Sequence, residues 1–119
     1  NNKLISNFKL GLINDHWGAL PLFKGRSTLQ WSKLFGSKLI LTNHLIKKEV
    51  DSGKIILYSE ANHKHVKKSI YFNLHNRIIN SITLLSLKKI YEINNNEGIV
   101  FFEMHKFILN HLKTINYDK

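Results

Sequence analysis

An asparagine and a histidine stand two residues apart directly after a short apolar segment. Gly-Leu-Ile at 11–13 runs into Asn14, Asp15 and His16. Because side chains alternate between the two faces of a strand, Asn14 and His16 would project from the same side of its C-terminal end. Amide and imidazole N–H groups are donors of the kind that stabilise an oxyanion. The spacing therefore indicates an active site at the end of a strand, which we expect over residues 10–14.

The residues after His16 are predicted to form a loop that is fixed at both ends. Gly-Ala-Leu-Pro favours a turn, and a basic Lys-Gly-Arg follows it. Ser27 and Gln30 then have the S-x-x-Q form of a capping box, which predicts a short helix over 27–34. Gly36 stands where a left-handed C-terminal cap would be. The loop would thus lead from the catalytic strand to the start of a helix.

Two further strands are predicted on either side of an acidic turn. The run at 39–46 is rich in β-forming residues, and 54–58 is a second apolar run. Asp51 begins the turn Asp-Ser-Gly between them. We expect both strands to join the first strand in one sheet and to bring the Asp51 carboxylate to the edge where Asn14 and His16 lie.

The C-terminal half of the chain changes to helical periodicity. A polar, linker-like stretch at 61–68 precedes a long amphipathic helix, predicted over 69–93 from its period of about 3.6 residues. This helix would lie on the sheet through an apolar stripe made of Leu74, Ile78, Ile79, Ile82, Leu85 and Leu87. A short run at 98–102 could add an edge strand, and 105–115 predicts a final surface helix.

The composition limits the classes of partner. The net charge is +10 from 18 Lys and Arg against 8 Asp and Glu. These basic residues are spread over the whole chain with no cluster larger than a pair, whereas nucleic-acid-binding arms concentrate them. We therefore disfavour a nucleic-acid partner, and we note that a basic surface suits anionic substrates.

Metal, disulfide and membrane chemistry are not expected. The chain has no cysteine, which excludes disulfides and thiolate zinc sites. His63 and His65 have no carboxylate beside them and lack a tetrahedral ligand set, so no metal is predicted. No apolar run approaches the ~18 to 20 residues of a membrane span, which makes a cytoplasmic protein without a membrane partner the default.

Several motifs together resemble a known family. Asn-x-His-x-Gly-x-Leu-Pro-x-x-Lys-Gly-Arg begins at Asn14, His44 lies 28 residues after His16, and Asp-Ser-Gly begins seven residues later at Asp51. This order and spacing resemble the second half of the folate-dependent formyltransferase domain over about residues 10–58. The resemblance implies an α/β, Rossmann-like fold. This chain would be its C-terminal half, with three to four strands and a long helix, a catalytic core at 10–58 and a helical part at 69–119.

The resemblance also implies residue roles. It transfers the catalytic roles to Asn14, His16 and Asp51: the first two would donate to the oxyanion, and the Asp51 carboxylate would accept the amine proton. His44 would be a supporting residue that orders Asp51 or a water molecule. No metal takes part in this scheme.

Two ligands follow from the same resemblance. The cosubstrate 10-formyltetrahydrofolate would be held, mainly by main-chain hydrogen bonds, at the turn formed by Lys47, Lys48, Glu49, Val50 and Asp51. The substrate would lie against Pro21, Lys24 and Arg26, with the two basic side chains able to meet a phosphate.

One segment indicates which class of amine would receive the formyl group. Gly-Arg-Ser-Thr-Leu-Gln-Trp at 25–31 is similar to enzymes that formylate the amino group of a nucleotide-linked amino sugar, and a homodimer is compatible with this reading. Glycinamide ribonucleotide formyltransferases share the Asn, His, His and Asp but differ in the helix that follows. Initiator methionyl-tRNA formyltransferases are disfavoured by His44 and by the lack of a C-terminal barrel domain. The alternative of another class is a non-catalytic fragment or binding remnant.

Overall fold

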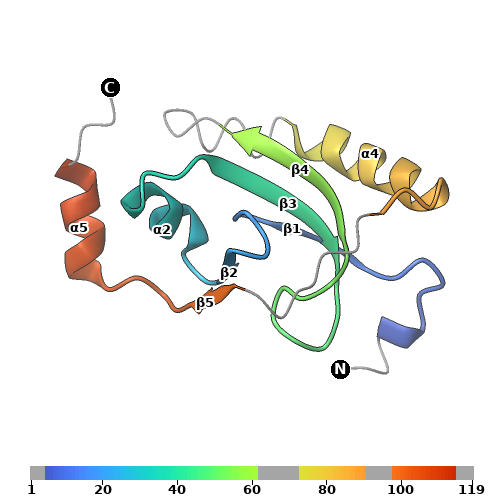
Figure 1. The fold of residues 1–119 in the computed structure, drawn as a ribbon, viewed down its shortest axis with the longest axis horizontal. Coiled ribbons are helices and arrows are strands. Elements are labelled where there is room, and N and C mark those ends of the chain that lie inside the picture. The colour runs from blue at the N-terminus through green and yellow to red at the C-terminus, as the bar shows by residue number, and fades with distance from the viewer. Residues whose placement is uncertain (1–4, 62–72, 91–97, 115–119) are drawn as a thin grey trace.

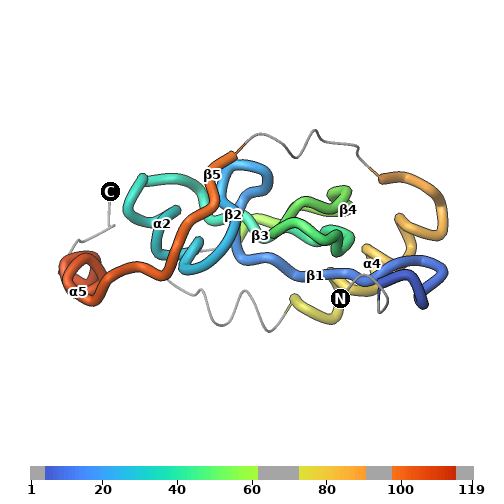
Figure 2. Tube along the Cα trace, turned by 90° about the horizontal axis from the view of Figure 1, so that it is seen from below, coloured from blue at the N-terminus to red at the C-terminus, as the bar shows by residue number. Residues whose placement is uncertain are grey.

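The computed structural model describes residues 5–61, 73–90 and 98–114, which form a mixed α/β unit (Figure 1). The elements with described bounds are, in chain order, β1 (Ile13–His16), β2 (Phe23–Gly25), α2 (Thr28–Leu34), β3 (Leu39–Leu45), β4 (Ile55–Ala61), α4 (Leu74–Ser86), β5 (Ile99–Phe101) and α5 (Lys106–Thr114). The linker predicted at 61–68 falls, after its first residue, outside the described residues, as do His63 and His65. The main sheet lies at the centre, with α2 and α5 toward one end and α4 toward the other (Figures 1 and 2).

The main sheet joins the three strands predicted in the first half of the chain. Its order is β1-β3-β4, and both pairings are antiparallel. Asn14 lies opposite His44 and Asp15 lies opposite Asn43, so the sheet brings residues about 30 positions apart into cross-strand pairs. The two strand predictions after residue 38 are confirmed, although β4 continues to Ala61, which packs with Leu39 and Leu41 in the apolar core.

The first strand lies further along the chain than predicted. It spans Ile13–His16 rather than 10–14, because Gly11 adopts a φ of 84° that interrupts the extended backbone. A side chain at Gly11 would also crowd Leu45, whose Cδ2 lies 3.1 Å from the position of an added Cβ. Asn14 and His16 therefore sit within the strand and share one of its faces.

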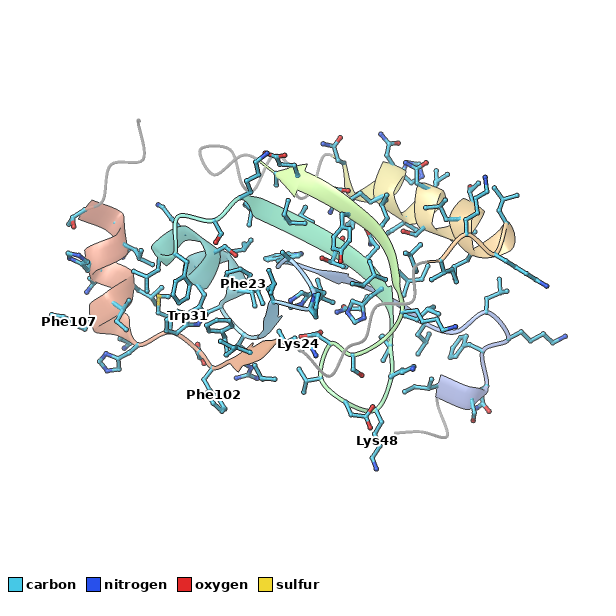
Figure 3. All side chains as sticks on the ribbon, viewed as in Figure 1. Phe23, Lys24, Trp31, Lys48, Phe102 and Phe107 are labelled. Atoms are coloured by element: carbon cyan, nitrogen blue, oxygen red, sulfur yellow. The ribbon has the colours of Figure 1, made fainter. Side chains whose placement is uncertain are left out.

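A second, two-stranded sheet supports the loop after β1. β2 pairs in parallel with β5, which confirms a strand near 98–102 but attaches it to the loop rather than to the main sheet. Phe101 of β5 stacks at 5.4 Å on Phe23 and lies 5.2 Å from Trp31 of α2, measured between ring centroids. The Trp31 indole N–H donates to the Phe102 carbonyl at 3.0 Å, while the Phe102 side chain points to solvent (Figure 3). These aromatic contacts join β2, β5 and α2.

Helix α2 ends as predicted but does not begin as predicted. The capping box is wrong: Ser27 adopts a left-handed φ of 53° and makes no side-chain cap, and its Oγ instead accepts the Met104 N–H at 3.1 Å. Thr28 Oγ1 donates to the Trp17 carbonyl at 2.5 Å and ties the helix start to β1. At the other end Gly36 has a φ of 61° and donates to Lys33, which completes the expected left-handed cap.

Helix α4 is shorter than predicted and faces another way. It spans Leu74–Ser86, whereas the prediction was 69–93, of which 69–72 and 91–93 lie outside the described residues, and it ends where Lys88 adopts a φ of 54°. Only part of the predicted apolar stripe lies inward: Leu74 and Leu85 are half-buried, whereas Ile78, Ile79 and Ile82 are exposed. The fully buried residues of the helix are Arg77 and Ser81, and Arg77 forms an ion pair with the sheet that is described below.

The last helix matches its prediction closely. α5 spans Lys106–Thr114, against a predicted 105–115, and lies beside α2 in two perpendicular views (Figures 1 and 2). Leu112 is buried at 4% exposure, while Phe107 points away from the molecule (Figure 3). This pairing of helices leaves a pocket between them, which is considered after the active site.

Candidate active site

The predicted acidic residue meets both predicted histidines. Asp51 lies in the loop between β3 and β4 with a left-handed φ of 46°, a conformation that Asp tolerates better than most residues. Its Oδ2 is 3.5 Å from His16 Nδ1, and its Oδ1 is 3.6 Å from His44 Nε2. The backbone N–H of Gly25 donates to Oδ2 at 2.8 Å. The carboxylate is therefore fixed by the backbone of β2 and faces two imidazoles at slightly longer range.

The hydrogen bonds of His16 define its tautomer. Its Nε2 is 2.6 Å from the Phe23 carbonyl, which can only accept, so Nε2 carries a hydrogen. When the ring is neutral, Nδ1 is bare and faces Asp51. Burial lowers the pKa of His16 below 6.5, partly offset by the Phe23 carbonyl and the Asp51 charge, which favours this neutral form at pH 7.

His44 orients the amide of Asn14. Its Nδ1 donates to the Leu45 carbonyl at 2.9 Å, which leaves Nε2 of the neutral ring as an acceptor. Asn14 Nδ2 lies 3.1 Å from this nitrogen and donates to it. The amide nitrogen carries two hydrogens and His44 takes one of them, so one N–H remains for a further acceptor.

The ionised form of Asp51 is favoured overall. Burial raises the pKa of the Asp51 carboxyl, but the nearby His44 ring, the Gly25 N–H and the positive charge that His16 or His44 would carry when protonated lower it further, and the net result lies below 3.8. At neutral pH the group is thus a carboxylate beside a bare imidazole nitrogen. This pair can accept one proton.

The opposite face of β1 carries a polar cluster that the sequence did not reveal. Arg77 of α4 binds Asp15 through Nη2 to Oδ2 at 2.8 Å and through Nε to Oδ1 at 3.2 Å. Asn43 Nδ2 donates to the same Asp15 Oδ1 at 3.1 Å. Arg77 is only 4% exposed. The sole signal in the sequence was an acidic residue inside a strand, and its partner lies 62 residues away.

A pocket opens at these catalytic candidates. It has a volume of about 490 Å³ and lies between the end of β1, the start of α2 and the Asp51 loop. One wall of the pocket is formed by the catalytic candidates Asn14, His16 and Asp51 together with Gly25. The wall toward α2 is formed by Thr28, Leu29 and Gln30. The volume is in the range of ~300 to 1,000 Å³ typical of small-molecule sites.

The turn predicted to hold the cosubstrate is exposed. Lys47, Lys48, Glu49 and Val50 all lie at the surface, and Lys48 points outward from the tip of the loop (Figure 3). A local hydrogen bond closes the loop: the Ser52 Oγ–H donates to the Glu49 carbonyl at 3.0 Å.

Gly53 fixes the same loop against β3. A Cβ added there would lie 1.3 Å from the Leu45 carbonyl oxygen, so only glycine fits. The turn is therefore closely packed at its base and accessible at its tip.

The three predicted substrate residues do not line the pocket. Pro21 follows a cis peptide bond and is half-buried, and Lys24 is 5% exposed beside β5 (Figure 3). Arg26 is exposed and pairs with Glu103 at 3.7 Å. None of the three is among the residues that form the walls of the catalytic pocket. Their roles in substrate binding stay predictions.

Two further properties concern only the described part of the chain. Among residues 5–61, 73–90 and 98–114, no group of three or more His, Cys, Asp or Glu side chains is arranged to hold a metal ion. Within the same residues, none of the helices has the length and apolar character needed to cross a membrane.

Comparison with known sequences finds a related protein over part of the chain. No protein-family model matches the chain. A stretch of 58 residues is 45% identical to the mitochondrial formyltetrahydrofolate deformylase 2 of Arabidopsis thaliana. This stretch covers 44% of this chain and 18% of that protein.

Comparison with solved structures finds the same fold in formyltransferases. The formyltransferase PseJ from Anoxybacillus kamchatkensis, solved in complex with UDP-4,6-dideoxy-4-formamido-L-AltNAc and tetrahydrofolate, matches with a TM-score of 0.70 and 23% identity over 99% of this chain and 65% of its own. A methionyl-tRNA formyltransferase from Clostridium thermocellum matches with a TM-score of 0.64 and 19% identity over 100% of this chain and 51% of its own. A 4-N formyltransferase from Francisella tularensis matches with a TM-score of 0.53 and 23% identity over 90% of this chain and 46% of its own.

These matches confirm the resemblance and the fold predicted from the sequence. The chain has the fold of the formyltransferases, and it spans 65% or less of each of these solved chains. The activity, the acceptor and the residue roles rest on the site itself.

Proposed function

We propose that this chain, which has the formyltransferase fold, carries the catalytic residues of an enzyme that transfers a formyl group from 10-formyltetrahydrofolate to the amino group of a nucleotide-linked amino sugar. One observation carries the proposal: Asn14, His16 and Asp51 converge on one pocket, with His16 Nδ1 3.5 Å from the carboxylate. The acceptor class is supported by PseJ, whose complex contains a formamido sugar linked to UDP.

The proton step belongs to His16 and Asp51 together. Bound 10-formyltetrahydrofolate would supply the formyl group. The attacking amine must lose a proton, and the bare Nδ1 of His16 beside the ionised Asp51 is the acceptor that the site offers. The same pair then returns the proton to the nitrogen that leaves the formyl carbon. His16 Nε2–H is already donated to the Phe23 carbonyl, so we assign His16 to this step rather than to the oxyanion.

We assign the stabilisation of the oxyanion to the side-chain amide of Asn14. One N–H of its amide is directed by His44, which leaves the second for the developing charge on the formyl oxygen. His44 thus acts as a positioning residue for Asn14 and as a second neighbour of Asp51. In this division His16 and Asp51 share the proton step, Asn14 stabilises the oxyanion, and His44 positions Asn14.

The ligand contacts of the proposal are those expected from the sequence. The turn of Lys47, Lys48, Glu49, Val50 and Asp51 would bind the cosubstrate through its backbone. Pro21, Lys24 and Arg26 would lie on the substrate side. A cytoplasmic location and a homodimer stay predictions.

A second candidate reaction is favoured by the deformylase match. If water replaced the amine, the same proton acceptor and amide donor would hydrolyse the formyl group and release formate. The 45% identity over 58 residues makes this the alternative to test.

One experiment separates these readings. The complete protein is incubated with 10-formyltetrahydrofolate alone and with a panel of UDP- and TDP-linked amino sugars, glycinamide ribonucleotide and initiator methionyl-tRNA. Mass spectrometry then measures formylated acceptor, and formate is assayed in parallel. We expect a formamido sugar that the Asp51→Asn variant does not produce. Formate without any formylated acceptor would establish hydrolysis instead, and no turnover at all would indicate a non-catalytic chain.

A further inference from the structure

A second pocket lies next to the catalytic one, between α2 and α5. It has a volume of about 540 Å³, and Leu29 and Gln30 of α2 belong to its wall as well as to that of the catalytic pocket. The two pockets are therefore neighbours that share these two residues of the first turn of α2.

The inner wall of this pocket is apolar and firmly packed. Four leucines form it, of which Leu39 and Leu112 are 1% and 4% exposed, and Leu29 and Leu109 are half-buried. Leu39 also belongs to the main core, so this wall is part of the fold rather than a loose surface. A flat, weakly polar ring would be desolvated here at little cost.

The polar part of the lining has one sign of charge. Lys33, Lys106 and Lys113 contribute to it, and no acidic side chain is among the described residues that do. Gln30 and Asn110 add amide groups, which both donate and accept hydrogen bonds, and Lys113 donates to Asn110 Oδ1 at 3.4 Å. Together these residues offer ammonium groups for phosphate oxygens and amides for the edge of a base.

We propose that the pocket between α2 and α5 binds the nucleoside diphosphate part of the substrate, while its amino sugar reaches the catalytic pocket across Leu29 and Gln30. The proposal deepens the proposed function and rests on it for the identity of the whole substrate. It also assigns the phosphate contacts to lysines that the sequence did not single out, since Lys24 is buried and Arg26 is paired with Glu103.

The test measures the affinity of the complete enzyme for uridine 5′-diphosphate by calorimetric titration. Lys106→Glu should raise the Kd by about fivefold to tenfold, as expected when an attractive ion pair becomes repulsive. Leu109→Trp, which fills the pocket and keeps its charge, should also weaken binding. Lys9→Glu is the matched control: it makes the same change in net charge at an exposed residue outside the pocket, and it should leave the Kd within about twofold.

Two readouts make the result specific. Tetrahydrofolate affinity and the thermal midpoint should stay unchanged in all three variants, which shows that the protein is folded. An unchanged diphosphate affinity in both Lys106→Glu and Leu109→Trp, or an equal loss in Lys9→Glu, overturns the proposal. Because this titration needs no turnover, a chain that binds the diphosphate here but formylates no sugar refutes only the proposed function. A sugar formyltransferase unaffected by the pocket variants refutes only this inference.

Discussion

The two faces of strand β1 use polar side chains in opposite ways. On one face Asn14 and His16 meet Asp51 and His44 at 3.1 to 3.6 Å. On the other face Asp15 is held by Arg77 at 2.8 Å and by Asn43 at 3.1 Å. In the Asp15 cluster Arg77 binds both carboxylate oxygens at hydrogen-bond distance. In the Asp51 cluster the His16 Nδ1 carries no hydrogen, and both imidazoles lie at 3.5 Å or more from the carboxylate. We call the Asp15 side of β1 the holding face, because its ion pair stabilises the strand. We call the Asn14 and His16 side the reacting face, because its groups stay available for a proton.

The largest effect is expected from breaking the holding face. Arg77→Met should lower the free energy of unfolding by about 3 kcal/mol, because removing one partner of a buried ion pair leaves the other charge uncompensated. Urea unfolding of the complete protein measures this. The double variant Asp15→Asn/Arg77→Met should recover a large part of the loss, since no charge then remains unpaired. Equal losses in the single and double variants would show that the pair does not hold β1.

A change on the reacting face should lower turnover and leave stability unchanged. Asp51→Asn keeps the size and most hydrogen bonds of the side chain but removes its charge, and should lower kcat by at least ~100-fold, as is typical of a positioned acid or base. The substrate KM and the thermal midpoint should change little. Steady-state kinetics of the complete enzyme decide the matter, and near-normal turnover in this variant would remove Asp51 from the mechanism.

The contrast between the faces also explains what the sequence could predict. Alternation along a strand places Asn14 and His16 together, and the spacing to Asp51 matches a loop between two strands. These are local signals. The partners of Asp15 are not local, because Arg77 lies on a helix 62 residues away whose isoleucines seemed to define the buried face. The side of α4 that carries Arg77, rather than the side that carries the isoleucines, is the buried one.

The ends of two helices were hidden for a similar reason. Lys88 ends α4 in a left-handed conformation that glycine usually adopts, so this end of the helix could not be predicted from the residue type. Ser27 has the residue type of a cap, but its side chain accepts no N–H from the first turn of the helix; its hydroxyl oxygen accepts the N–H of Met104, far along the chain. A tertiary contact therefore takes the place of the cap at Ser27, whereas the bonds that close α4 at Lys88 are local.

The pH dependence of stability should report on the reacting face with a smaller effect. The pKa of His16 lies below 6.5 in the folded protein, so the unfolded chain takes up a proton first as the pH falls through 6.5. The stability due to neutral His16 is therefore complete above that pH and declines below it. The pKa of Asp51 is also lowered, so its contribution is complete above 3.8 and is lost only at more acid pH. Urea unfolding at pH 7.5 and 5.5 should show a decline that His16→Gln abolishes; the same decline in both proteins would contradict the assignment.

The smallest effect is expected at the tip of the turn that follows the reacting face. Lys48 is exposed and points to solvent, and the proposal has the backbone of this turn, rather than its side chains, bind the cosubstrate (Figure 3). Lys48→Ala should therefore change the Kd for tetrahydrofolate by less than about threefold, the order expected of one solvated charge. Gly53→Ala is the contrasting variant, because its added Cβ would clash with the Leu45 carbonyl and displace the backbone. Fluorescence titration of the complete enzyme compares the two. A larger loss in Lys48→Ala than in Gly53→Ala would mean that the side chains bind the cosubstrate and the backbone only carries them.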